Sequence, residues 1–152
     1  TTEPSLSGTN VMLSNKAAVG TEVYGISGMS STFVAAEVDG QMRLFQRVSF
    51  NGNALKGSET LADVMQLSGH VASIELSGVG TITDTNVCAD LISLLLNDAT
   101  YESSGSLSAK QSLLIELDNG LVYQFTVKND KIASCGTWSC PEFFEAFEAA
   151  CE

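Results

Sequence analysis

Two segments of the chain share one pattern, in which an apolar run, a tight turn and a second apolar run follow one another. The first occupies residues 34–45 around Asp39-Gly40, and the second occupies residues 113–125 around Asn119-Gly120. Both dipeptides are strong hairpin signals, because the central positions of such a turn take a positive φ. The pattern therefore predicts two antiparallel hairpins, each of which continues toward a short amphipathic helix.

Apolar residues spaced by three and four predict two internal helices. A short helix through residues 61–67 is expected after Ser58 as its N-cap, and a longer helix over residues 85–96 is expected after Asp84. The apolar stripe of the longer helix consists of Val87, Cys88, Leu91, Ile92 and Leu95.

A third helix is expected at the end of the chain. Ser139 and Glu142 have the spacing of a capping box, in which each side chain satisfies a backbone donor near the other residue. One face of this helix carries Phe143, Phe144, Phe147 and Cys151. Glu142, Glu145, Glu148 and Glu152 lie toward the opposite face. The phenylalanines predict a face that packs into the core.

Alternating runs predict further strands at 22–26, 71–76, 112–118, 121–128 and 131–135, with a polar loop at 98–110. Strands joined by tight turns pair antiparallel, so the chain is predicted to be α+β. We expect a flexible stalk over residues 1–10, a first half over residues 11–77 and a similar second half over residues 78–152. Two arrangements fit, one with a sheet in each half and one with a single sheet shared through residues 71–76.

The composition indicates a folded and acidic protein. The 152 residues are 44% hydrophobic and carry a net charge of −11. The excess of acid is greatest in the second half, where residues 77–152 hold three Lys or Arg against eleven Asp or Glu. Such a surface repels phosphate backbones and anionic lipids, so nucleic acids are poor candidates for partners, whereas a basic partner suits the second half. The chain is expected to be a monomer.

The N-terminal residues predict export. No apolar run approaches the length of about 20 residues that a transmembrane helix requires. Residues 1–10 are polar and resemble a stalk that follows a removed signal peptide or a lipid-anchored cysteine. We therefore expect an extracellular or cell-surface-anchored location.

Four cysteines, Cys88, Cys135, Cys140 and Cys151, form an even set that is typical of two disulfides in an exported domain. Cys140 and Cys151 flank the last expected helix and would lie about 16 Å apart, which is too far for a bridge. Cys135 and Cys151 face a similar separation. The pairing Cys135–Cys140 with Cys88–Cys151 is therefore predicted. Buried free thiols, a zinc site and a redox pair are the alternatives.

The sequence predicts no catalytic residue and no cofactor or metal site. His70 is the only histidine, and no phosphate-binding loop, dinucleotide fingerprint, EF-hand loop or nucleophile elbow occurs. Trp138 is the one candidate contact residue, because a five-residue turn between Cys135 and Cys140 would display it rigidly. The alternative is that Trp138 covers Phe143 and Phe147. Glu142, Glu145 and Glu148 are the other candidate interaction residues.

The second half resembles a module of exported proteins and lipoproteins from Gram-positive bacteria. The likeness consists of residues 81–84, an apolar helix, a polar loop, the hairpin at 114–125, a third strand and a Phe-rich terminal helix. Residues 22–26, 33–39 and 61–67 are similar to the segment that often precedes this module. The resemblance implies an extracytoplasmic location and a non-enzymatic role.

These observations lead to one principal hypothesis and two alternatives. The principal hypothesis is a secreted or surface-anchored, non-catalytic module that binds a protein or a cell-wall component. The first alternative is an inhibitor that blocks a secreted enzyme with an exposed loop. The second is a thiol-disulfide enzyme that uses Cys135 and Cys140.

Overall fold

A computed structural model describes residues 16–27, 33–46, 60–65, 67, 69–103, 107–108, 111–134 and 136–151. The expected stalk at 1–10, the expected cap Ser58 and Cys135 lie outside these residues. The strands are β1 Val23–Gly25, β2 Phe33–Val38, β3 Gln41–Gln46, β4 Val71–Leu76, β5 Gly80–Ile82, β6 Thr100–Ser103, β7 Gln111–Leu117, β8 Val122–Val127, β9 Lys131–Ala133 and β10 Thr137–Ser139. The helices are α1 Leu61–Met65, α2 Thr85–Asp98 and α3 Pro141–Cys151.

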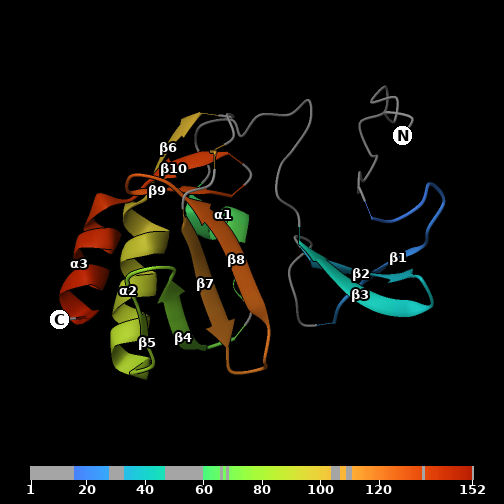
Figure 1. Ribbon diagram of the computed structural model, residues 1–152, viewed down its shortest axis with the longest axis horizontal. Coiled ribbons are helices and arrows are strands. Elements are labelled where there is room, and N and C mark those ends of the chain that lie inside the picture. Colours follow the sequence, from blue (N-terminus) through green and yellow to red (C-terminus); the bar gives the residue numbers. More distant parts are fainter. Residues whose placement is uncertain are drawn as a thin grey trace.

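The described strands form two antiparallel sheets, which confirms the α+β class (Figure 1). The smaller sheet has the order β1-β2-β3, and the larger has the order β5-β4-β7-β8-β9-β10-β6. Strand β4, which we assigned to the first half, pairs with β5 and β7 in the larger sheet. Helix α1 packs against α2 instead of covering the first hairpin. The prediction of two similar halves is therefore not confirmed.

The turns follow the local sequence only in part. Asp39 and Gly40 have φ values of 55° and 74°, as expected for the first hairpin. In the second hairpin only Gly120 has a positive φ, of 82°, and the Leu117 amide donates to the Leu121 carbonyl at 2.8 Å. This is a three-residue loop with a bulge, so the expected two-residue Asn-Gly turn is wrong.

Three strands were not predicted, and two helix caps differ from the prediction. Strand β6 lies within the expected loop at 98–110, while β5 and β10 are only three residues long. Thr60 caps α1 through reciprocal bonds with Asp63 at 2.8 and 3.2 Å. Ser139 belongs to β10, and the carbonyl of Cys140 accepts the first bond of α3, from the Phe144 amide at 3.4 Å. The capping box expected at Ser139 is therefore wrong.

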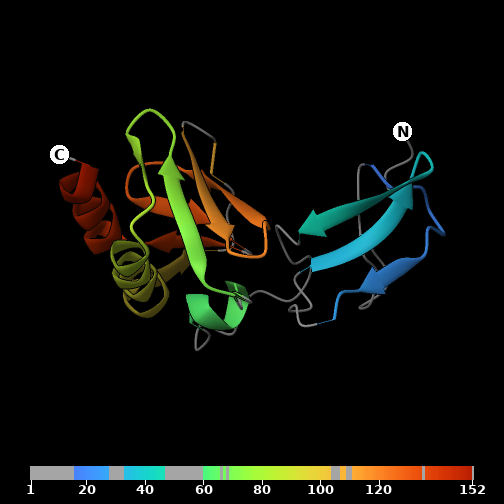
Figure 2. The same ribbon diagram turned by 90° about the horizontal axis from the view of Figure 1, so that it is seen from below.

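One face of the larger sheet is buried and the other is largely open to solvent. On β7, Leu113, Ile115 and Leu117 are buried, whereas the side chain of the intervening Glu116 is exposed. Helix α2 packs against β4, and α3 packs against both α2 and β5 (Figure 2). The alternation of side chains along the strands thus places one continuous core between the helices and the buried sheet face.

Candidate binding groove beside helix α2

A groove of about 580 Å³ lies between α2 and the chain that leads into β4. It is lined by Leu67, Gly69, His70, Val71, Thr85, Ala89, Ile92 and Leu96. We call this feature the α2 groove. Its volume lies within the range of sites that take small ligands or a few side chains, and six of its eight lining residues are apolar or glycine.

The wall formed by α2 follows from the helical repeat. Asp84 caps the helix, as predicted, by accepting bonds from the amides of Asn86 and Val87 at 2.9 and 3.1 Å. Cys88, Leu91 and Leu95 face the core and are buried. Thr85, Ala89, Ile92 and Leu96 are spaced by four, three and four residues, so they form a neighbouring stripe that lines the groove.

The opposite wall is held in place by the turn between β7 and β8. The Asp118 amide donates to the His70 carbonyl at 2.8 Å. Gly69 has a φ of 134°, and a Cβ at this position would lie 3.0 Å from Oδ1 of Asp118. Glycine therefore permits both the backbone conformation and the close approach of the Asp118 carboxylate.

The groove lies in a negatively charged part of the surface. Asp84 caps α2 next to the lining residue Thr85, and Oδ1 of Asp118 lies 3.0 Å from the position of a Cβ on Gly69. Helix α2 carries no Lys or Arg, and its other acids, Asp90 and Asp98, lie on sides of the helix away from the groove. Farther away, Lys131 pairs with Glu102 at 2.6 Å. The carboxylates give the groove a field that favours cationic groups.

The sequence patterns did not identify this groove. Ile92 was assigned to the core stripe of α2, but it is only half-buried and lines the groove. His70, the only histidine of the sequence, is exposed and also lines the groove. The sequence did contain one signal for the groove, because the apolar stripe of α2 is wider than contact with the core alone requires. Ile92 extends this stripe beyond the buried residues Cys88 and Leu95.

Trp138 is a core residue and not a displayed contact. Its side chain is 1% exposed, its Nε1–H donates to the Ser134 carbonyl at 2.8 Å, and its ring meets Tyr101 edge to face at 5.3 Å. The expected turn is replaced by strand β10, which pairs with β9 and β6 and directs Trp138 to the buried face. The prediction of an exposed Trp138 is therefore wrong, and the alternative of a covering core residue is favoured.

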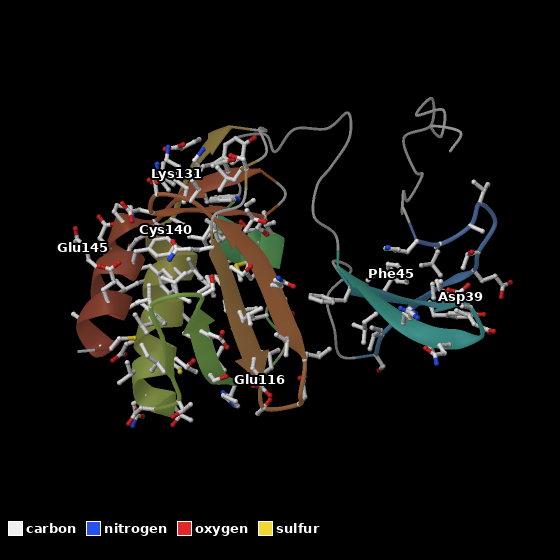
Figure 3. All side chains as sticks on the ribbon, viewed as in Figure 1. Asp39, Phe45, Glu116, Lys131, Cys140 and Glu145 are labelled. Atoms are coloured by element: carbon white, nitrogen blue, oxygen red, sulfur yellow. The ribbon has the colours of Figure 1, made fainter. Side chains whose placement is uncertain are left out.

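The glutamates of α3 occupy the predicted side of that helix. Glu142, Glu145 and Glu148 are exposed, whereas Phe143, Phe144 and Phe147 are buried. Figure 3 shows Glu145 on the outer side of α3, away from Cys140 at the start of the helix. None of these three glutamates lines the α2 groove.

Cys88, Cys140 and Cys151 are free thiols in the structure, so neither expected bridge is formed there. Cys88 and Cys151 nevertheless approach the same short strand. Sγ of Cys88 lies 3.5 Å from the Ile82 carbonyl, and Sγ of Cys151 lies 2.8 Å from the position of a Cβ on Gly80. Gly80 and Ile82 both point to the buried face of β5, since they pair with Leu76 and Ile74.

The environment of Cys140 is opposite to that of a redox-active thiol. The residue is buried, and burial, together with the charges of Asp130 and Glu142, raises the pKa of its thiol to about 12. Reactive thiols instead have a lowered pKa and lie near cationic groups.

In the described parts of the chain, no group of three or more His, Cys, Asp or Glu side chains is arranged to hold a metal ion. None of the described helices has the length and apolarity needed to cross a bilayer. Comparison with known protein families, with curated proteins and with solved structures found no match to this chain.

Proposed function

We propose that this protein is a secreted or surface-anchored, non-catalytic module that binds a protein partner through the α2 groove. The observation that carries the proposal is the groove itself, an open and mainly apolar hollow of about 580 Å³. Apolar surface that remains accessible beside polar residues is characteristic of interaction sites. The even number of cysteines and the resemblance to exported modules support an extracytoplasmic location.

The α2 helix offers a matched pair of variants for testing the groove. Ala89 lines the groove and Asn86 does not, and both are exposed positions within one turn of each other. Ala89→Trp would fill the hollow, whereas Asn86→Trp adds the same side chain outside it. Because both sites are exposed on a helix, both variants should keep the melting temperature of the wild type.

The experiment is affinity capture from the culture medium and envelope of the source organism, followed by measurement of binding with the purified partner. Wild type and Asn86→Trp should bind the same protein, and Ala89→Trp should bind it at least about tenfold more weakly, a loss of about 1.4 kcal/mol. Equal affinities for all three proteins would refute the groove as the docking site.

A further inference from the structure

We infer that the segment seated in the α2 groove is an amphipathic helix of the partner, with apolar residues on one side and Lys or Arg beside them. This inference rests on the proposed function and adds the chemistry of the partner. The lining stripe from Thr85 to Leu96 covers eleven residues of helical rise, or about 16 Å. Its spacing by four, three and four residues forms the kind of ridge against which a second helix packs.

The small residues of the groove allow such a helix to approach closely. Ala89 stands in the middle of the α2 wall, and Gly69 stands in the opposite wall, while Ile92 and Leu96 supply apolar contacts at one end. An apolar side chain of an incoming helix can therefore enter between the walls. Anchors at i, i+3 and i+4 are the usual means by which a helix binds a groove.

An extended peptide is the competing occupant of this site. Strand β4 pairs with β7 from Val71 to Leu76, whereas β5 pairs only with residues Ile74 to Leu76, so residues 71–73 have a strand partner on one side only among the described strands. The apolar stripe of α2 favours an incoming helix, which brings its own backbone already hydrogen-bonded. Amide shifts that show a strand added along residues 71–73 would overturn the inference.

The charge of the groove specifies the polar side of the incoming helix. Asp84 caps α2 next to the lining residue Thr85, and Asp118 stands against Gly69 on the other wall. No basic side chain accompanies these acids on α2. Lys or Arg flanking the apolar face of the partner would meet these carboxylates, and complementary charge sets specificity and the rate of encounter.

Two synthetic peptides test the inference directly. One is a peptide of about 14 residues made of Leu and Lys, patterned as an amphipathic helix, and the other has Glu at every Lys position. Binding is measured by fluorescence anisotropy of labelled peptide, and the contact site is mapped by amide chemical shifts. The Leu/Lys peptide should bind at least about tenfold more tightly than the Leu/Glu peptide, with shifts at α2 and at residues 67–71.

The two groove variants separate specific docking from general attraction to an acidic protein. Ala89→Trp should weaken binding of the Leu/Lys peptide, and Asn86→Trp should leave it unchanged. Equal binding to both variants, shifts concentrated at Glu142, Glu145 and Glu148 of α3, or equal affinity for the two peptides would overturn the inference.

Failure of the inference can be distinguished from failure of the proposed function. If Ala89→Trp blocks the natural partner and the Leu/Lys peptide does not compete with that partner, the groove binds a different chemistry and only the inference is overturned. If Ala89→Trp leaves capture of the natural partner unchanged, the groove is not the docking site and both are overturned.

Discussion

The ring of Phe33 in β2 meets the ring of Tyr123 in β8 edge to face, with centroids 4.5 Å apart and planes 71° apart. Phe33 is 4% exposed and Tyr123 is 1% exposed. The contact joins the smaller sheet to the core under the larger sheet. Much of the smaller sheet remains accessible, since Met42 and Leu44 of β3 are 60% and 52% exposed. Phe33 is therefore a principal anchor of that sheet.

Replacing Phe33 by Ala should loosen the smaller sheet more than the larger one. Loss of a buried phenylalanine costs about 3 kcal/mol, whereas Phe33→Leu retains most of the apolar contact and should cost about 1 kcal/mol. Hydrogen exchange should become faster in β2 and β3 while β7 keeps its protection. An equal increase throughout both sheets would contradict the role of Phe33 as a local anchor.

Trp138→Ala should destabilise the whole domain. The substitution removes a side chain that is 1% exposed and leaves the Ser134 carbonyl without its bond to Nε1, so we expect a loss of about 3 to 5 kcal/mol in urea unfolding. Trp138 is the only tryptophan of the chain, so its emission should be blue-shifted in the native protein and should move to the red on unfolding. Native emission typical of a solvated indole would show that the ring is not buried.

Gly80→Ala should destabilise the contact between β5 and α3. The added methyl group would lie 2.8 Å from Sγ of Cys151, and such overpacking costs about 1 kcal/mol. In a Cys151→Ala background the same substitution should cost much less, and this difference is the coupling measured by a double-mutant cycle. Gly25→Ala is the control, because in the described part of the chain no heavy atom beyond its chain neighbours lies within 4 Å of a Cβ there. Equal costs in the two backgrounds would contradict the contact.

The thiols of the reduced, native protein should react with iodoacetamide in the order of their exposure. Cys151 is exposed and should be modified first, while Cys88 and Cys140 are buried and should react only after unfolding.

The same reagent tests the predicted disulfides when it is applied, in denaturant, to protein from an oxidising source. Each disulfide lowers the mass of the protein by two hydrogens. Peptide mapping should recover Cys88–Cys151, whereas complete alkylation without reductant would exclude both bridges.

Stability of the reduced protein should fall in alkaline solution through Cys140. Its pKa is raised to about 12 in the folded state, so the unfolded chain releases the proton first, above the ordinary thiol pKa of about 8.5. The contribution of the protonated Cys140 thiol to the free energy of unfolding is complete below pH about 8.5. It is lost progressively as the pH rises toward about 12.

Comparison with Cys140→Ala isolates this effect from other alkaline titrations. Between pH about 8 and 10.5 the wild type should lose on the order of 2 kcal/mol more unfolding free energy than the variant. Cys151→Ala removes an exposed thiol and should behave as the wild type does. Equal alkaline losses in wild type and Cys140→Ala would show that Cys140 is not the group responsible.

Local sequence patterns were sufficient for most of the regular elements. Strand β4 occupies residues 71–76 as expected, and α2 begins after Asp84 because an aspartate there satisfies free amides of the first turn. The Asp39-Gly40 turn also follows from residues that tolerate a positive φ. The acidic outer side of α3 could also be predicted locally, because the helical repeat places Glu145 and Phe144 on different sides of the helix.

Only the tertiary structure decided where those elements pair and which apolar residues they leave open. Strands β6 and β10 are short and have little signal of their own, and they exist through pairing with each other and with β9. That pairing turns Trp138 inward, and the bond from Asp118 to His70 sets the wall of the α2 groove. Sequence by itself determined the local conformations, because propensities and turn chemistry act between neighbours. The sheets, the groove and the burial of Trp138 depend on contacts between residues distant along the chain, which no local pattern records.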